Sequence, residues 1–176
     1  MEDMKLDLKS KIREVPDFPK KGILFYDITT LLSDSLAMEE AIAQLTLPYR
    51  DKQIQKVVAV ESRGFIFGAP MAGHLNAGFV PVRKPGKLPH TKIEEHYDLE
   101  YGTDTLGIHE DAVLPGERVL IVDDLLATGG TMAATAKLVQ RLGGEIVGIA
   151  FMIELLFLKG REKIKDLPVF SLLTYE

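Results

Sequence analysis

Two adjacent carboxylates, Asp123 and Asp124, stand directly before a loop of small residues that runs from Ala127 to Thr131. The run Val119–Val122 before them is entirely apolar, as expected for a strand buried on both faces of a parallel sheet. The residues after the loop, Met132–Leu142, are compatible with a helix. The first N–H groups of a helix lack partners and its dipole is positive there, so this end attracts an anion. The stretch therefore predicts a phosphate site with two carboxylates beside it.

The residue types indicate which phosphate compound fits. Gly129 and Gly130 let the backbone come close to an anion, and the hydroxyls of Thr128 and Thr131 can add donors. The lysine of a Walker loop is missing, as are the three spaced glycines of a dinucleotide motif. Carboxylates repel phosphate but accept hydrogen bonds from sugar hydroxyls, so a ribose 5-phosphate group satisfies the whole stretch. The simpler alternative is that the aspartates cap the loop and the glycines make a turn.

Composition limits the class of protein. The 176 residues are enough for one domain with a substantial core, and 46% of them are hydrophobic and 27% charged. The net charge of −5 and the sequence pI of about 5.4 disfavour nucleic acid as a partner. There is no cysteine, so disulfides and thiolate metal sites are excluded. The charged N-terminus lacks the apolar core of a secretory signal, and no uncharged run suits a membrane span. We expect a soluble, cytoplasmic protein.

The first third of the chain predicts three elements. Asp3–Glu14 has apolar residues among charges and favours an amphipathic helix. Asp17–Leu32, punctuated by proline and glycine, reads as an edge strand or a loop packing on the core. Ser35–Tyr49 is typical of a helix with a serine or aspartate cap.

A second strand–loop–helix unit precedes the acidic pair. Lys56–Val60 predicts a buried strand, Glu61–Phe65 (ESRGF) follows it, and a helix and a strand at Phe79–Val82 come next. Loops after parallel strands emerge at the same carboxyl edge, where open α/β folds bind ligands. Ser62 and Arg63 could therefore donate to an anion across a cleft from the glycine loop. A surface ion pair is the alternative for Arg63.

The segment Arg83–Lys92 carries four cations and no acid in a net-acidic protein, which indicates an anionic ligand; a solvated loop is the alternative. Tyr97–Asp111 alternates well enough for two short strands hinged at Gly102. A polar region of this length at a ligand edge is typical of a lid. Further strands are predicted at Glu145–Phe151 and Val169–Tyr175. The histidines lack metal-ligand spacing, and the whole predicts an α/β fold.

Six segments together resemble the adenine phosphoribosyltransferase family of type I phosphoribosyltransferases over essentially the whole chain. They are FPKKGILFYDITTLL, ESRGF, RKPGKLP, LEYG, VDDLLATGGTM and IELLFLKGREK. The resemblance implies a mostly parallel five-stranded sheet flanked by helices, with a hood at about 1–32 and a flexible lid hairpin at about 84–116 in a single domain. It also implies transfer of ribose 5-phosphate from phosphoribosyl diphosphate to N9 of adenine, giving AMP and diphosphate. Mg²⁺ held mainly by the substrate and a homodimer are implied as well.

The resemblance also assigns residue roles. Asp123 and Asp124 would hold the ribose hydroxyls, and Ala127, Thr128, Gly129, Gly130 and Thr131 would hold the 5-phosphate. Glu61, Ser62 and Arg63 would form the diphosphate site, helped by Arg83, Lys84 and Lys87. Adenine would lie between Phe25 and Leu155, with backbone groups of Leu24 and Tyr26 reading its edge. Glu100 and Arg63 would be catalytic, with Glu100 reaching the base and Tyr101 helping to close the site.

One departure from the family pattern is visible at Tyr26, where many members have arginine after the phenylalanine. Because a backbone role is implied there, we expect the change to be tolerated. Two other functions fit the same sequence less well. One is a phosphoribosyltransferase for a 6-oxopurine such as hypoxanthine, and the other is a non-catalytic regulator on the same fold, which the acidic pI and the LEYG segment disfavour.

Overall fold

A computed structural model describes residues 6–98 and 102–176, and the chain divides into two compact units, residues 1–44 and 45–176. The smaller unit has a two-stranded antiparallel sheet of β1 (Arg13–Pro16) and β2 (Leu24–Asp27), followed by α1 (Thr29–Leu32). Helix α2 (Ser35–Thr46) begins in this unit and runs into the next. The predicted strand or loop before residue 32 is thus a strand and a short helix.

The predicted helix over Asp3–Glu14 is wrong for the described part of that range. A single 3-10 turn forms at Lys9–Lys11, where Asp7 accepts hydrogen bonds from the N–H groups of Lys9 and Ser10. The chain then enters β1, whose residues pair with β2. Three apolar residues among charges bury too little surface to hold an isolated helix, and sheet pairing satisfies the backbone instead.

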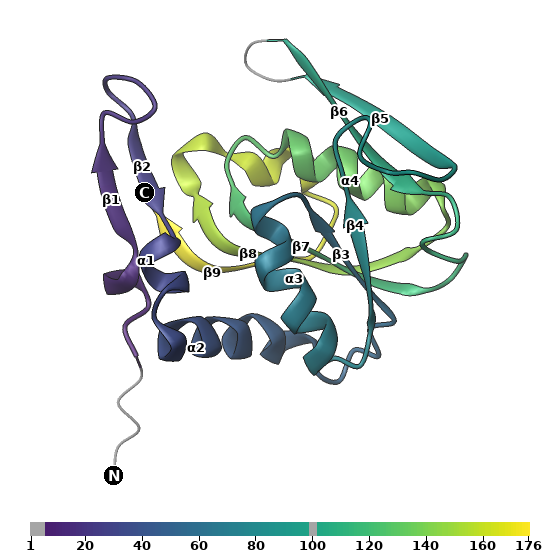
Figure 1. Ribbon diagram of the computed structural model, residues 1–176, viewed down its shortest axis with the longest axis horizontal. Helices are drawn as coiled ribbons and strands as arrows, with labels where there is room; N and C mark the ends of the chain where they lie inside the picture. Colours follow the sequence, from purple (N-terminus) through teal and green to yellow (C-terminus); the bar gives the residue numbers. More distant parts are fainter. Residues whose placement is uncertain (1–5, 99–101) are drawn as a thin grey trace. The chain divides into compact units, whose positions relative to one another are not determined.

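The larger unit is built on a five-stranded parallel sheet, which confirms the predicted α/β fold. Its strand order is β4-β3-β7-β8-β9 (Figure 1). The elements are β3 (Lys56–Val60), α3 (Arg63–His74), β4 (Gly78–Val82), β7 (Arg118–Leu126), α4 (Gly130–Arg141), β8 (Glu145–Leu155) and β9 (Val169–Tyr175). Short 3-10 helices lie at Leu47–Tyr49, Leu156–Leu158 and Gly160–Ile164.

The strand order reverses between β3 and β7. From β3 the chain crosses through α3 to β4 on one side, and from β7 it crosses through α4 to β8 on the other. Right-handed crossovers in opposite directions place α3 and α4 on opposite faces of the sheet. Ligands of open α/β sheets bind outside the carboxyl ends of the strands at such a reversal. The fold therefore brings the loops after β3 and β7 together, as the sequence predicts.

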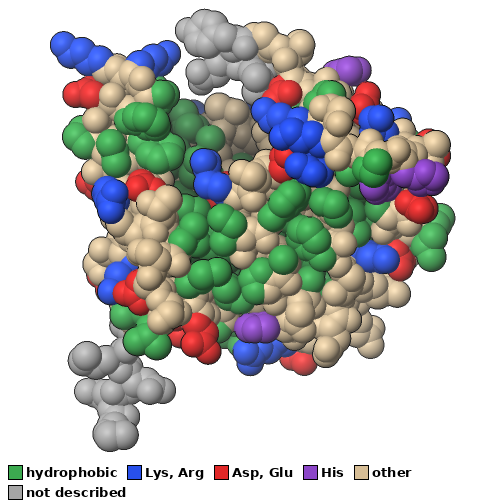
Figure 2. Space-filling view, viewed as in Figure 1, with side chains coloured by type: hydrophobic (Ala, Val, Ile, Leu, Met, Phe, Trp, Pro, Cys, Tyr) green, Lys and Arg blue, Asp and Glu red, His purple; other side chains and the backbone are tan. Residues whose placement is uncertain are grey.

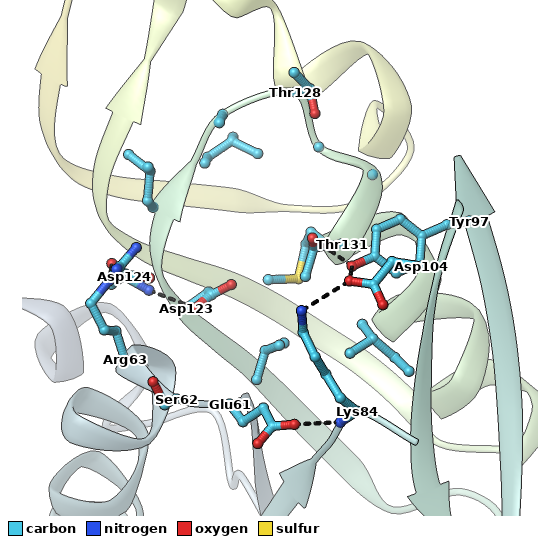
Figure 3. A pocket seen from close by; sticks show the side chains of 18 of the residues that line it. Glu61, Ser62, Arg63, Lys84, Tyr97, Asp104, Asp123, Asp124, Thr128 and Thr131 are labelled. Carbon is cyan, nitrogen blue, oxygen red and sulfur yellow. Dashed lines mark hydrogen bonds and ion pairs between the residues drawn. The ribbon is translucent and has the colours of Figure 1, made fainter. Parts of the chain in front are cut away.

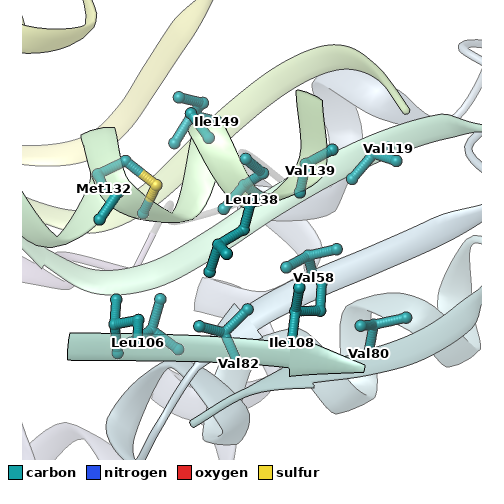
Figure 4. Close-up of a cluster of buried hydrophobic side chains, with 14 of the residues drawn as sticks. Val58, Val80, Val82, Leu106, Ile108, Val119, Met132, Leu138, Val139 and Ile149 are labelled. Atoms are coloured by element: carbon teal, nitrogen blue, oxygen red, sulfur yellow. The ribbon is translucent and has the colours of Figure 1, made fainter. Parts of the chain in front are cut away.

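A β-hairpin of β5 (Lys92–Asp98) and β6 (Thr103–His109) follows β4. Leu106 and Ile108 of this hairpin are buried in the same core as Leu138 and Val139 of α4 and Val119 of the sheet (Figure 4). β6 is also joined to the end of β4 by the bridge between Arg83 and Gly107. The hairpin is thus packed on the α4 face; its role as a lid stays a prediction.

Candidate functional site

A pocket of about 660 Å³ opens at the sheet edge where β3 and β7 end (Figure 3). Its walls come from the ends of β3 and β7, the start of α3, the segment after β4, the hairpin and the start of α4. The lining residues are Val60, Glu61, Ser62, Arg63, Lys84, Lys87, Tyr97, Asp104, Leu106, Asp123, Asp124, Leu125, Leu126, Ala127, Thr128, Gly129, Gly130, Thr131 and Met132.

One wall is the loop Ala127–Thr131 that leads into α4. Gly129 precedes the helix in the left-handed conformation, with φ of 80°, and its carbonyl accepts the first helical hydrogen bond from Ala133 at 2.9 Å. A Cβ added at Gly129 would overlap the carbonyl oxygen of Gly160, so two backbone segments touch here without side chains between them. The helix leaves its first N–H groups unpaired at the pocket, which suits an anion.

The acidic pair lies at the end of β7 beside this loop. Asp123 accepts a hydrogen bond from the N–H of Asp124 at 2.9 Å, and Asp124 forms an ion pair with the guanidinium of Arg63. Burial, followed by the neighbouring charge of Asp124, raises the pKa of Asp123 well above its ordinary value. Asp123 thus resists ionisation beside Asp124.

At the opposite wall, Glu61 binds groups of the segment Arg83–Lys92, which we call the basic segment. Its side chain is only 6% exposed and accepts hydrogen bonds from the N–H of Lys84 at 2.5 Å, from Lys87 at 3.0 Å and from Arg83 at 3.1 Å. Burial alone would raise the pKa of Glu61, but these donors together lower it. In Figure 2, Lys and Arg side chains gather on the face shown, over the segment joining β4 to the hairpin, which carries Lys84 and Lys87.

A chain of side-chain contacts joins this basic segment to the glycine loop (Figure 3). The ammonium of Lys84 lies 3.1 Å from Asp104, and the hydroxyl of Tyr97 donates to the same carboxylate oxygen at 3.3 Å. The hydroxyl of Thr131 donates to the Tyr97 oxygen at 3.3 Å. Hydrogen bonding and charge from Asp104 raise the pKa of Lys84, and burial raises the pKa of Tyr97. The ammonium thus stays charged and its place in the pocket is defined.

Most of the predicted site residues come together in this pocket. Those lining it are Glu61, Ser62, Arg63, Lys84, Lys87, Asp123, Asp124 and Ala127–Thr131. Arg83 does not line it and is directed to Glu61 instead. Arg63 combines both interpretations given for it, because it lines the pocket and is also ion-paired.

Other predicted contacts lie elsewhere. Leu155 ends β8 and is not a lining residue, whereas Leu24, Phe25 and Tyr26 form part of β2 in the smaller unit. Glu100 and Tyr101 lie outside the described residues. The roles predicted for all of these residues remain predictions.

Sequence reasoning missed Tyr97 and Asp104. They face each other across the hairpin, where the register pairs Tyr97 with Asp104. The hinge predicted at Gly102 would have paired Tyr97 with Gly107, so it did not indicate the contact between this tyrosine and the carboxylate of Asp104. The contact depends on the register of the folded hairpin, which composition alone does not set.

The oxygen donors of the pocket suit a magnesium ion that arrives with a phosphate compound. Among residues 6–98 and 102–176 there is no cluster of three or more His, Cys, Asp or Glu side chains able to hold a metal ion. Mg²⁺ commonly takes one or two protein carboxylates and completes its shell with substrate phosphates and water. Asp123 and Asp124 could supply such a contact.

In the described part of the chain, no helix has the length and apolarity needed to cross a membrane.

Comparisons with known proteins agree with this geometry. Residues 29–173 match the family described as phosphoribosyl transferase domain. An adenine phosphoribosyltransferase from Acidobacterium capsulatum is 64% identical over 96% of this chain and 93% of its own length. The crystal structure of adenine phosphoribosyltransferase from Thermoanaerobacter pseudethanolicus has 54% identity and a TM-score of 0.92, covering 96% of this chain and 98% of that one. The Saccharomyces cerevisiae enzyme, complexed with adenine and an imino-altritol bisphosphate, has 40% identity and a TM-score of 0.91 over 96% and 98%.

Proposed function

Because this chain belongs to the adenine phosphoribosyltransferase family, we propose that its pocket transfers the 5-phosphoribosyl group from phosphoribosyl diphosphate to adenine, giving AMP and diphosphate. This is a pentosyltransferase reaction of purine salvage. The observation that carries the proposal is the pocket itself, in which an acidic pair lies between a helix N-terminus and a group of cations. The acidic pair suits the ribose hydroxyls, the helix N-terminus suits the 5-phosphate, and the cations suit the diphosphate.

The loop side of the pocket suits the sugar phosphate. The N–H groups at the start of α4 and the hydroxyls of Thr128 and Thr131 would bind the 5-phosphate. Asp123 and Asp124 would accept hydrogen bonds from the ribose hydroxyls.

The opposite wall suits the diphosphate. Ser62, Arg63, Lys84 and Lys87 line it, and Glu61 holds the basic segment in place rather than binding phosphate itself. Arg83 would act through Glu61. Magnesium bound with the substrate would neutralise part of the diphosphate charge, with Asp123 or Asp124 as its protein contacts.

The mechanism follows from where charge develops. Breaking the bond between the anomeric carbon and the diphosphate oxygen leaves positive charge on the ribose and negative charge on the leaving group. Arg63, Lys84 and Lys87 would stabilise the leaving group, and the acidic pair would lie beside the cationic sugar. Closing the pocket to water would prevent hydrolysis of the activated sugar. The predicted lid would serve that purpose.

Glu100 would handle the proton chemistry of adenine. N9 becomes nucleophilic as the imidazole part of the base adjusts its proton, and a carboxyl group near N7 can follow that change. General acid–base help is worth about 10²- to 10⁴-fold in rate. We therefore expect Glu100→Gln to lower kcat by about that factor while the affinity for phosphoribosyl diphosphate stays nearly constant. Near-normal kcat in a folded Glu100→Leu protein would contradict the assignment.

A panel of bases tests the proposed function directly. Purified protein with phosphoribosyl diphosphate and Mg²⁺ should consume adenine and release AMP and diphosphate. Hypoxanthine and guanine should react far more slowly. Preference for a 6-oxopurine would favour the second candidate, and no reaction with any base would reject the proposal.

We further propose a cytoplasmic homodimer, which light scattering of the purified protein and fractionation of its source cells would check.

A further inference from the structure

Every pocket cation that would bind diphosphate is already paired with a carboxylate. Arg63 pairs with Asp124, Lys87 with Glu61 and Lys84 with Asp104. A diphosphate that enters this pocket must therefore take its cations from built-in anions. The cost of that exchange depends on what each carboxylate keeps after its cation has left.

The three carboxylates differ in this respect. Glu61 is buried and shares its oxygens among three donors, so losing its cations would leave a buried charge poorly paired. Asp124, with its side chain 11% exposed, stands beside Asp123 and needs Arg63 as its counter-charge. Asp104 has a side chain 22% exposed, and its partner Lys84 is 53% exposed. Water can thus compensate Asp104 and Lys84 better than the other two pairs.

Asp104 also keeps other donors when Lys84 departs. The N–H of Thr105 donates to one carboxylate oxygen at 2.8 Å, and the Tyr97 hydroxyl donates to the other at 3.3 Å. Burial alone would raise the pKa of Asp104, but the bonds from Thr105 and Lys84 lower it overall. The donors from Thr105 and Tyr97 hold the carboxylate in place, so it does not follow the ammonium. Lys84 is the cation that can change partner at the lowest cost.

On the basis of the proposed function, we propose that Asp104 limits the affinity of the pocket for diphosphate by competing for the ammonium of Lys84. An incoming diphosphate must break the Lys84–Asp104 pair and then sits near a carboxylate that has lost its counter-charge. Both effects oppose binding. Because free diphosphate is the leaving product, this competition would favour its release. Asp104 is then an affinity-setting residue that acts through Lys84 and has no contact of its own with the reacting atoms.

Titration of the full-length enzyme with inorganic diphosphate at constant Mg²⁺ tests the proposal. Exposed ion pairs and nearby like charges are each worth about 0.2–1 kcal/mol. The Kd for diphosphate should therefore fall about threefold to tenfold in Asp104→Asn. The Kd for ribose 5-phosphate should stay the same, which also reports that the pocket is intact. Glu94→Gln removes an exposed charge from the same hairpin, outside the pocket lining, and should leave both constants unchanged.

A double substitution isolates the competition for Lys84. In a Lys84→Met background the further change Asp104→Asn should give a clearly smaller gain, because the repulsion by the carboxylate remains but there is no ammonium left to be released. An equal gain in that background would overturn the proposal, since Asp104 would then act only through long-range repulsion. Unchanged or weaker diphosphate binding in Asp104→Asn would overturn it too. Failure of the parent protein to bind diphosphate would instead reject the proposed function, and this proposal with it.

Discussion

The two sides of the pocket for which we propose anion binding are built in different ways. On the loop side the donors are backbone N–H groups, fixed by α4 and by the contact between Gly129 and Gly160. On the cation side the donors are side chains, each held by a carboxylate. Fixed dipoles need no rearrangement when charge arrives, whereas paired side chains must change partners. The side proposed to bind the sugar phosphate is therefore rigid, whereas the side proposed to bind diphosphate must exchange partners.

Among the substitutions that test this comparison, the largest expected effect comes from breaking the rigid side. Gly129→Ala puts a methyl group where the Gly160 carbonyl oxygen lies, at a φ of 80° that alanine rarely adopts. Neither backbone can move away without disturbing the other. We expect the free energy of unfolding to fall by about 2–4 kcal/mol and the affinity for AMP to fall at least about tenfold, because the N–H groups turn away. Urea unfolding and calorimetry with AMP measure the two changes.

Gly73 in α3 offers the same substitution in open space. A Cβ there meets nothing within 4 Å, and the residue is helical. Gly73→Ala should therefore leave AMP binding unchanged and stabilise the protein by about 0.5–1 kcal/mol. If Gly129→Ala behaved in the same way, the loop would not be as rigid as its contact with Gly160 indicates.

A second, smaller effect should come from the support beneath that contact. Glu154 at the end of β8 is 2% exposed and binds Arg161 through two bonds of 2.7 Å and Ser171 at 2.6 Å. This ion pair anchors the 3-10 helix Gly160–Ile164, whose first residue packs on the loop Ala127–Thr131. Unlike the cation-side pairs, it has no proposed ligand with which to exchange. Glu154→Gln should lower stability by about 1–3 kcal/mol.

The pH dependence of that loss follows from the pKa of Glu154. The hydrogen bond from Arg161 lowers this pKa from its ordinary value of 4.5. A carboxylate with a lowered pKa stabilises the folded protein above its unfolded-state value, and the contribution is lost as the pH falls through the folded-state value. The stability difference between parent and Glu154→Gln should thus be full at neutral pH and shrink below about pH 4.5. If the stability difference stayed constant from about pH 4.5 down to about pH 3, the ionic role of Glu154 would be contradicted.

The difference between the loop side and the cation side of the pocket also explains which parts of the site could be predicted from the sequence. The loop side is encoded in one continuous stretch, since the apolar strand, Asp123 and Asp124, the glycines and the helix follow one another directly. The strand–loop–helix unit around Arg63 repeats that order, so the meeting of both loops at one sheet edge could also be predicted. Both predictions depended only on residues close together in the chain and on the handedness of crossovers.

Contacts between distant segments could not be predicted in this way. Gly160 follows Gly129 by about thirty residues, and only the packing of the folded chain brings their backbones together. The contact between Asp104 and Tyr97 depends on the hairpin register. Glu61 contacts several cations because β4, which leads into their segment, lies beside β3. The N-terminal helix was wrong because pairing with β2 outweighed a weak helical pattern. Sequence thus predicted which residues would meet in the pocket better than it predicted the contacts between them.

The smallest expected effect concerns a single cation on the exchangeable side. Lys87 lines the pocket, its side chain is half exposed, and it is one of several donors to Glu61. Lys87→Ala should raise KM for phosphoribosyl diphosphate about threefold to tenfold, and this effect should shrink with added salt. AMP carries no diphosphate, so its affinity should hardly change.

Two further variants serve as comparisons for Lys87→Ala. Arg83→Ala should have a smaller direct effect, because Arg83 is directed to Glu61 and does not line the pocket. Lys92→Ala, at the start of β5 outside the lining, is the charge-matched control. Steady-state kinetics at two salt concentrations and calorimetry with AMP separate these outcomes. Equal losses for AMP and phosphoribosyl diphosphate would show that the substitution distorts the basic segment and that Lys87 is part of the rigid framework.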